Sequence, residues 1–568
     1  MWNAPHVPAP GLQLVLGQAP ALANLGVGLL RRGEREAAHA ALRQAVRADP
    51  GMAIAHASLG HVYYLMGKPA EDEAACRRAL ARSPAHAEAW FNLGVILRDV
   101  GRADAAATAF SAVIASRPGF AQAHANLGVL QRDALDLDSA LAAFTRAPDL
   151  DPDFPEADSN ALVTMLYMNR FSAAEVSAAH RARAGRHEAR VRDRRRAHDN
   201  APDPERQLRI GYLAPQLRAH VLAPVMLPLL EHHEHERFSI HVFAHVPNPD
   251  ATTARMQSLV DEWTFIHGLD DDQAAERVRA AGIDILVHPM GHWADNRFMV
   301  LARKPAPVQV AYNCNALTLG LDAVDYAIVD RWLDHDGALG ALMTETPVHL
   351  PGGFQLQAFD IAPGIAPPPV GARGHVTFGS FNNPAKISAT TIRLWSRALA
   401  AVPGARLLLK GRGLDRPEIA KRLIRDFVAA GLGADRIELR GVVADPADHL
   451  ASYGEVDIAL DTLPFTGGRT TLDALWMGVP VVTLRGEGMY GRYSAGYLDR
   501  IGTGELVAAN EAGYVALATD LAQSPDRLAD YRRRLRDLIR ASPLMDGPRH
   551  ARELEDAYRQ MWRRWCAA

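Results

Sequence analysis

The sequence contains few cysteines and no long apolar run, and both absences narrow the class of protein. Its three cysteines, Cys76, Cys314 and Cys566, are far apart and match no metal-binding spacing. A reducing compartment is therefore the simpler assumption. The N-terminal residues have neither the basic segment nor the long apolar core of an export signal, and no apolar run is long enough to span a membrane. We expect a cytoplasmic protein with no membrane partner.

The chain also lacks an excess of charge of either sign. The formal net charge is -3, so there is no overall attraction to nucleic acid or to a membrane surface, and we expect neither as a partner. Hydrophobic residues make up 48% of the chain and charged residues 22%, the proportions of a folded globular protein. Its 568 residues have material for roughly three to four domains.

The first third of the chain repeats with a period of 34 residues. Leu-Gly pairs recur at this spacing, with their glycines at Gly26, Gly60, Gly94 and Gly128. Prolines follow the same period, at Pro50, Pro84, Pro118 and Pro152. A small residue lets the two helices of a repeat pack closely, and a proline ends the second helix before the next repeat begins. The pattern resembles the tetratricopeptide repeat over residues 20–155 and predicts an α-solenoid over residues 1–170.

Asparagines recur in these repeats, at Asn24, Asn92, Asn126 and Asn160. One interpretation is that these amides line a concave groove that binds a protein or peptide. The other is that they only tie neighbouring helices together. The sequence leaves both interpretations open.

Residues 171–206 form an arginine-rich segment that includes HRARAGRHEARVRDRRRAHDNAPDPERQ. Such a run is compatible with a nucleic-acid patch. Its interspersed acidic residues and helical spacing favour instead a solvated helix that links two domains.

From Leu208 onward, strands and helices alternate in two series separated by a proline-rich linker, residues 351–374. The first series, residues 207–350, has the strand-like runs LRIGYLA, FSIHVFAHV, DILVHPM, VQVAYN and DYAIVD. The second, residues 375–568, has HVTFGSFN, ARLLLKG, RIELRGVV, VDIALD and VPVVTL. Each series predicts a doubly wound, Rossmann-like parallel sheet covered by helices, so the fold class is an α-solenoid followed by α/β. Two such domains form a cleft where the carboxyl ends of their strands meet.

The stretch 457–483, DIALDTLPFTGGRTTLDALWMGVPVVT, predicts a strand, a glycine turn, a helix and a second strand. Its Gly-Gly pair lets the backbone approach a bound group closely. We expect Thr470 and Thr471 at the cap of the helix, where free N–H groups favour an anion, and Asp473 in the first turn, where it could accept hydrogen bonds from a ribose. This layout suits a nucleotide diphosphate, although an ordinary capped helix would share it.

Taken together, these motifs resemble the O-linked N-acetylglucosamine transferase family of GT-B glycosyltransferases. The resemblance rests on RIGYLAPQLRAHVLAPVM, PAPVQV, FGSFNNPAKI and the stretch 457–483, and on repeats placed directly ahead of two sheet domains. The resemblance covers roughly residues 20–565. The chain is similar to a bacterial member of the family and lacks the long insertion that animal enzymes carry between the two sheets. It implies a GT-B arrangement of the two Rossmann-like domains.

The activity that the resemblance implies is an inverting transfer of N-acetylglucosamine. The donor would be UDP-GlcNAc, and the acceptors would be serine or threonine hydroxyls of proteins presented by the repeat groove. Two alternatives keep the same fold: a different donor, such as GDP-fucose, or a scaffold that binds UDP without transferring a sugar.

The resemblance also implies two residues for the chemistry. Lys386, in the turn before a helix that begins near Ser388, matches the lysine that contacts the leaving diphosphate. His220, in the loop after strand LRIGYLA, matches the family's cleft histidine. An imidazole there could accept the acceptor's proton, or it could only position the sugar and the hydroxyl.

Other residues match the family's nucleotide-binding positions. His449 matches a histidine that stacks on uracil, and backbone groups near Val443 and Ala444 would read the edge of the base. The positions that match contacts to diphosphate, ribose or nucleotide are Thr470, Thr471, Asp473, Asn383 and Arg469. Asn383 stands where the family has glutamine, and Arg469 stands where relatives often have histidine.

The cleft segments contain no convincing DxD motif. Residues 270–272 fall in a polar loop, and Asp334 and Asp336 follow the last strand expected in the first sheet. We therefore expect no metal and no cofactor beyond the donor: a lysine and a helix dipole would neutralise the diphosphate. The segments 313–320, NCNALTLG, and 214–216 depart from the family pattern and leave the sugar and the acceptor open.

Overall fold

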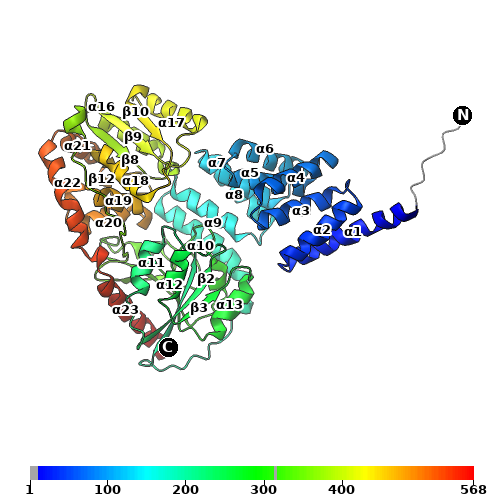
Figure 1. Cartoon of the computed structure of the whole chain (residues 1–568). Helices are drawn as coiled ribbons and strands as arrows, with labels where there is room; N and C mark the ends of the chain where they lie inside the picture. The colour runs from blue at the N-terminus through cyan, green and yellow to red at the C-terminus, as the bar shows by residue number, and fades with distance from the viewer. Residues whose placement is uncertain (1–9, 313–315) are drawn as a thin grey trace. The chain divides into compact units, whose positions relative to one another are not determined.

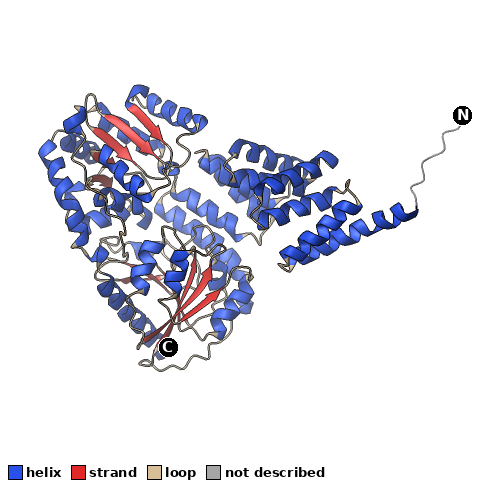
Figure 2. Cartoon of the chain, in the orientation of Figure 1, coloured by secondary structure: helices blue, strands red, loops and turns tan. Residues whose placement is uncertain are grey.

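A helical unit and a unit built on two sheets make up the chain (Figure 1, Figure 2). The units are Met1–Ala157 and Asp158–Ala568. The computed structural model describes residues 10–312 and 316–568. No helix among these residues is long and apolar enough to cross a membrane.

Helices pack in consecutive pairs throughout the described part of the first unit. The pairs are α1 (Pro10–Arg31) with α2 (Arg35–Ala48), α3 (Ala53–Leu65) with α4 (Pro69–Arg82), α5 (Ala87–Asp99) with α6 (Ala103–Ser116), and α7 (Ala121–Asp133) with α8 (Leu137–Leu150). The next helix, α9 (Pro155–Leu166), begins in the first unit and ends in the second. The α-solenoid expected from the 34-residue period is confirmed.

The repeated glycines lie where the two helices of a repeat touch. A Cβ atom on Gly94 would meet the Phe110 ring at 2.7 Å, and one on Gly128 would meet the Phe144 ring at 2.9 Å. Both distances are too short for a real side chain, so these positions require glycine. The turn between the helices has a positive φ that favours glycine, and in the fourth repeat Leu135 adopts it instead, with φ 65°.

One repeated asparagine ties neighbouring helices together. Asn92 of α5 donates from Nδ2 to the carbonyl oxygen of Ala57 on α3, at 3.2 Å. Asn126 of α7 instead donates to Gln122 of its own helix, at 2.8 Å, and accepts a hydrogen bond from Arg98. The structure therefore supports the tying role for Asn92.

The arginine-rich segment contains α10 (Ala173–Ala189), which is less solvated than its composition predicts. One face of α10 is buried, including Ser177, His187 and Glu188. Glu188 accepts hydrogen bonds from the backbone N–H groups of Asp322 and Ala323, at 2.9 and 2.7 Å. The prediction of a solvated helix is wrong for this face, because its charged side chains find partners in the first sheet domain. After η1 (Arg192–Arg194) the chain has no helix or strand up to residue 207.

The first sheet has seven parallel strands within the described residues, in the order β3-β2-β1-β4-β5-β6-β7. They are β1 (Leu208–Pro215), β2 (Phe238–His245), β3 (Glu262–Phe265), β4 (Ile285–His288), β5 (Val308–Ala311), β6 (Tyr326–Val329) and β7 (Thr346–His349). Its helices are α11 (Ala223–Leu230), α12 (Ala251–Gln257), α13 (Asp271–Ala280) and α14 (Phe298–Ala302). The central strands are buried, as their apolar sequences require.

The second sheet has six parallel strands in the part of the chain that is described, in the order β10-β9-β8-β11-β12-β13. They are β8 (Thr377–Ser380), β9 (Arg406–Lys410), β10 (Ile437–Arg440), β11 (Ile458–Leu460), β12 (Val481–Leu484) and β13 (Val507–Ala508). Its helices are α16 (Ala389–Ala400), α17 (Pro417–Ala429), α18 (Pro446–Ala451), α19 (Arg469–Trp476), α20 (Tyr493–Arg500), α21 (Glu511–Ala522) and α22 (Pro525–Arg540). The short α15 (Val370–Arg373) precedes β8. The expectation of two parallel, doubly wound sheets is confirmed.

Single-turn 3-10 helices occupy several of the connections. They are η2 (Leu339–Leu342), η3 (Pro384–Lys386), η4 (Ala434–Arg436), η5 (Ser452–Glu455), η6 (Met489–Gly491), η7 (Gly504–Leu506) and η8 (Pro543–Met545). The last helix, α23 (Gly547–Ala567), packs against the first sheet domain rather than the second (Figure 1). There His550 is 2.7 Å from the Tyr312 hydroxyl, and Glu555 is 2.9 Å from His233.

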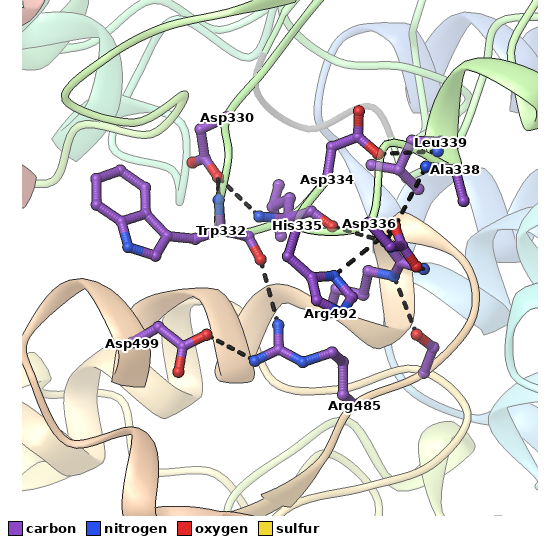
Figure 3. A network of polar contacts seen from close by, with 12 residues as sticks. Asp330, Trp332, Asp334, His335, Asp336, Ala338, Leu339, Arg485, Arg492 and Asp499 are labelled. Carbon is purple, nitrogen blue, oxygen red and sulfur yellow. Dashed lines mark hydrogen bonds and ion pairs between the residues drawn. The ribbon is translucent and has the colours of Figure 1, made fainter. Parts of the chain in front are cut away.

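Ion pairs join the two sheet domains beside β6. Arg492 forms a two-pronged pair with Asp336, at 2.8 and 2.9 Å, and the guanidinium holds the pKa of this carboxyl at about 2 (Figure 3). Arg485 donates to the Trp332 carbonyl at 3.2 Å and to Asp499 at 2.6 Å (Figure 3). These contacts connect the loop after β6 with the segment that contains α20, so the two sheets are linked on this side.

Candidate active site

Functional side chains gather at the carboxyl ends of β8, β9 and β11 in the second sheet. Because these strands are parallel neighbours, the segments that follow them meet at one edge of the sheet. The segment after β8 carries Asn382 and Lys386, β9 ends at Lys410, and Asp461 directly follows β11. This edge is where a ligand of a doubly wound sheet is expected.

A buried carboxylate shapes the loop between β11 and α19. One oxygen of Asp461 accepts hydrogen bonds from the backbone N–H groups of Thr462 and Gly467, at 2.9 and 2.7 Å. The other accepts one from the Thr483 hydroxyl at 2.6 Å. Burial raises the pKa of Asp461, and these hydrogen bonds oppose the rise. The carboxylate thus holds both ends of the glycine loop that leads into α19.

Lys386 lies beside this loop with its ammonium group over an aromatic ring. Its Nζ atom is 3.9 Å from the centre of the Phe465 ring and donates to the Thr466 carbonyl at 2.8 Å. Burial lowers the pKa of Lys386 to about 8, against the attraction of the Asp461 carboxylate. A cation is therefore held where the loop and the start of α16 meet. The prediction that a helix begins near Ser388 is confirmed, since Ser388 is the N-cap of α16.

Phe465 places Lys386 at the junction of the two sheet domains. Its ring centre is 6.0 Å from that of Trp293, which lies in the loop between β4 and α14, and 5.8 Å from that of Tyr167, which follows α9. Tyr490, beyond β12, lies 5.9 Å away. Aromatic rings from both sheet domains and from the end of α9 thus surround Phe465, the residue that Lys386 packs against.

The helix that carries the two threonines starts earlier than the sequence predicts. Gly468 is the N-cap of α19, so Thr470 and Thr471 lie inside its first turn rather than at the cap. Thr470 donates from its hydroxyl to the Asn382 side-chain oxygen at 2.8 Å, and the Thr471 hydroxyl is 2.7 Å from that of Ser494. The pair Gly467–Gly468 precedes the helix because the chain enters it from a tight loop. The free backbone N–H groups of this turn remain the feature suited to an anion.

Asp473, the fifth residue of α19, lies just past the first turn rather than in it, and it is buried. It is paired with Arg469 on the same helix face, where Arg469 Nε is 2.6 Å from Asp473 Oδ1. The Arg469 guanidinium also lies 4.9 Å from the centre of the Phe359 ring, which stacks on Trp476 at 4.2 Å. The arginine that replaces the family's histidine thus pairs with a carboxylate in this structure.

A cavity of about 120 Å³ brings three of the predicted residues together. His449, Arg469 and Asp473 line it from the second sheet domain. Pro224 of α11 and Phe359 of the linker 351–374 close it from the other side. His449 Nε2 is 3.7 Å from Asp473 Oδ2. The cavity between the two sheet domains thus presents a histidine ring, a carboxylate and a guanidinium.

The remaining residues predicted to bind the nucleotide lie at the surface. Val443 and Ala444 are exposed in the loop between β10 and α18, with their backbone groups outside any strand or helix. Asn383 is exposed and caps η3 by accepting a hydrogen bond from the Ala385 N–H at 3.1 Å. Its buried neighbour Asn382 is the asparagine that contacts Thr470. Sequence reasoning missed Asn382, although its place at a strand end gave a signal.

His220 lies in the loop between β1 and α11, as predicted, and is partly buried. Its Nδ1 atom accepts a long hydrogen bond, 3.4 Å, from the Leu222 N–H. Burial and the nearby Arg218 lower the pKa of His220, whereas Asp295 opposes this. The lowered pKa favours the neutral imidazole, the form that can accept a proton.

The aspartates considered for a DxD motif have protein partners. Asp271 pairs with Arg297 at 2.8 Å, Asp334 with His349 at 2.8 Å, and Asp336 with Arg492. Within residues 10–312 and 316–568, no cluster of three or more histidine, cysteine or acidic side chains has an arrangement that could hold a metal ion. Of the segment 313–320, residues 313–315 lie outside the described residues, and Thr318 and Leu319 bind the buried Glu345.

Repeats followed by two facing Rossmann-like sheets, with a lysine and a helix N-terminus at the sheet edge, define a GT-B glycosyltransferase with tetratricopeptide repeats. The family model "Glycosyl transferase family 41" matches residues 164–335 and 372–554, and "Tetratricopeptide repeat" matches residues 24–87 and 91–155. The chain belongs to glycosyl transferase family 41. The resemblance inferred from the sequence is confirmed, and with it the class of glycosyltransferases.

Similar proteins come from plants and from a bacterium. The chain is 37% identical over 412 residues to a probable UDP-N-acetylglucosamine--peptide N-acetylglucosaminyltransferase SPINDLY of Arabidopsis thaliana, which is 72% of this chain and 45% of that protein. It is 27% identical over 375 residues to the Arabidopsis thaliana protein SEC, described in the same terms, covering 64% of this chain and 38% of that one. The chain thus spans less than half the length of these plant relatives.

A solved structure of similar extent is a mutant of the O-GlcNAc transferase of Thermobaculum terrenum. It is 34% identical to this chain, has a TM-score of 0.83, and covers 91% of this chain and 98% of its own. The GT-B arrangement and the repeats that precede it are therefore shared over nearly the whole chain.

We expect two lysine side chains of this site to titrate well below an ordinary lysine. The sequence has only five lysines, so the Cε signals of a protein labelled with ¹³C-lysine can be followed by NMR as the pH is raised. Burial lowers the pKa of both Lys386 and Lys410 to about 8, compared with about 10.4 for a solvated lysine.

Replacement by arginine assigns the two signals. Lys386→Arg should remove one of the signals that titrate near pH 8, and Lys410→Arg should remove the other. If every lysine signal titrates near pH 10, the burial of these two ammonium groups is wrong.

Proposed function

We propose that this protein transfers N-acetylglucosamine from UDP-GlcNAc to serine or threonine hydroxyls of protein acceptors, with inversion at the sugar carbon and without a divalent metal. The observation that carries the proposal is the position of Lys386, whose ammonium contacts the glycine loop that leads into the first turn of α19. Both features suit a diphosphate that gains negative charge as it leaves. The tetratricopeptide repeats would bind the acceptor protein.

The diphosphate would lie against the N-terminus of α19. The backbone N–H groups of its first turn have no helical partners and point toward the loop, so they favour an anion there. In the described structure Lys386 donates to a neutral carbonyl, that of Thr466, and is in no ion pair. Its charge is therefore available to a phosphate oxygen, and its stabilising effect grows as the bond to the sugar breaks.

The base of the nucleotide would lie at the cavity between the two sheet domains. The ring of His449 would stack on uracil, and backbone groups of Val443 and Ala444 would read the edge of the base. Asp473 would accept a hydrogen bond from a ribose hydroxyl, and Arg469 would contact a phosphate or keep its pair with Asp473. Asn383, which is exposed in the segment after β8, would make a further contact with the nucleotide.

His220 would act on the acceptor. Because its pKa is lowered, the imidazole is neutral and can take the proton that the attacking hydroxyl loses, or orient that hydroxyl by a hydrogen bond. It belongs to the loop just before α11, whose Pro224 lines the cavity. The relatives support the proposal, since those described above are named as N-acetylglucosaminyltransferases acting on peptides or as an O-GlcNAc transferase.

The proposal is tested by incubating the protein and a cell lysate with isotopically labelled nucleotide sugars and searching for modified peptides by mass spectrometry. Labelled UDP-GlcNAc should yield modified serine or threonine residues. Transfer from GDP-fucose alone, or UDP binding without transfer from any donor, would reject the proposal in favour of one of the two alternatives.

Lys386→Ala should reduce turnover far more than it weakens UDP binding. Removing one charge that acts mainly on the transition state costs about 2.7–4 kcal/mol, or roughly 100- to 1,000-fold in kcat. The affinity for UDP should change by less than about fivefold, since the backbone N–H groups of α19 remain. Steady-state kinetics and calorimetry measure the two effects, with Lys421→Ala, an exposed lysine on α17, as the control. Equal losses of turnover and affinity would contradict this role.

His220→Ala should slow transfer by roughly 100-fold or more, the usual contribution of a general base. UDP affinity should stay within about twofold, because the histidine acts on the acceptor side of the donor. Transfer rates and UDP titration check both parts, with His375→Ala in the segment before β8 as the control. A normal rate for His220→Ala would remove this histidine from the mechanism.

A further inference from the structure

A second buried lysine lies at the same sheet edge, and sequence reasoning gave it no role. Lys410 is the last residue of β9 and is 3% exposed. Its Nζ atom lies 4.4 Å from the centre of the Phe381 ring and donates to the carbonyl oxygen of His449 at 3.2 Å. A buried charge is costly unless it has such partners, so its presence here requires an explanation.

We propose that Lys410 is a positioning residue for nucleotide recognition: it anchors the short helix α18, so that His449 faces the base of the nucleotide. This inference rests on the function proposed above. It assigns Lys410 a role in affinity for the nucleoside part of the donor, distinct from the role of Lys386 in the departure of the diphosphate.

The helix α18 needs an anchor because it is short. It spans six residues, Pro446–Ala451, and so short a helix is not stable by itself. Asp445 caps its N-terminus by accepting hydrogen bonds from the Ala447 and Asp448 N–H groups, at 2.7 and 3.1 Å. At the other end Lys410 donates to the carbonyl of His449, in the last turn, where a cation is favourable. The lysine thus fixes the backbone of the residue whose ring lines the cavity.

Aromatic contacts extend this anchor toward the diphosphate side of the site. Phe381, which Lys410 packs against, lies 4.4 Å from the Tyr453 ring. Tyr453 is buried, lies 5.9 Å from the His449 ring, and donates from its hydroxyl to the Thr470 carbonyl at 3.1 Å. Lys410, Phe381, Tyr453 and Thr470 therefore form one continuous chain of contacts from β9 to α19.

Charged side chains of both signs lie around Lys410. Asp473 and Glu455 attract it, Arg440 repels it, and burial lowers its pKa to about 8. Arg440 is itself paired with Glu455 at 2.6 Å. Because Lys410 is almost completely covered, a bound nucleotide would not touch it directly. Its effect would reach the base through the position of α18.

The test compares Lys410→Met with Lys410→Arg, and uses UDP and inorganic pyrophosphate as separate probes. Lys410→Met removes the charge and the donor but keeps the length of the side chain. It should weaken UDP binding at least about tenfold, the cost of one charge-assisted hydrogen bond. Pyrophosphate affinity should stay within about twofold, and kcat at saturating donor within about threefold. Lys410→Arg should restore UDP affinity to within about threefold of the natural protein.

Phe381→Leu serves as a second variant if Lys410→Met fails to fold, as judged by thermal unfolding. It keeps the lysine but removes the ring beneath it, and should also weaken UDP binding selectively. Lys421→Met, on the exposed face of α17, is the matched control.

Three results would overturn the role of Lys410: unchanged UDP affinity in Lys410→Met, equal losses of UDP and pyrophosphate, or an arginine variant no better than methionine. A natural protein that binds neither UDP nor another nucleotide would instead reject the proposed function.

Discussion

The loop between β11 and α19 keeps its shape because the buried carboxylate of Asp461 binds backbone N–H groups at both of its ends. Further hydrogen bonds support the loop, from Thr466 to the Tyr490 carbonyl and from Ser494 to the Gly467 carbonyl, but only Asp461 binds both of its ends among the contacts described. The shape of the proposed anion site thus depends on a side chain that is itself too deeply buried to touch a ligand. The cost of burying this charge is offset by the hydrogen bonds it accepts.

The site divides into two parts, each built around one lysine and one aromatic ring. On the proposed diphosphate side, Lys386 rests on Phe465, which packs among aromatic residues of both sheet domains. On the proposed base side, Lys410 rests on Phe381 and donates to a carbonyl of α18. In both cases the ammonium group hydrogen-bonds to a backbone carbonyl; Lys410 ends β9, and Lys386 lies in the segment that follows β8. The two sheet domains are also joined by ion pairs beside β6 (Figure 3).

Much of this architecture could be predicted from the sequence, because it depends on local patterns. The 34-residue period and the buried apolar strands define the repeats and both sheets. The strands that the sequence did not predict, β3, β7 and β13, lie at sheet edges; β3 and β7 lack an apolar run, and β13 is only two residues long. The N-cap at Gly468 and the inward-facing Asn382 and Lys410 depend on contacts between segments distant in sequence. A lysine ending ARLLLKG looks like an ordinary strand end, and only the fold shows that it is covered.

The central claim is that an ammonium group and a helix end together stabilise the departing UDP. The most direct measurement is a crystal structure of the UDP complex grown in the presence of EDTA. The account predicts phosphate oxygens within about 3 Å of Lys386 Nζ and of backbone N–H groups in the first turn of α19. A diphosphate bound elsewhere, or one that occupies the site only when manganese replaces the chelator, would contradict it.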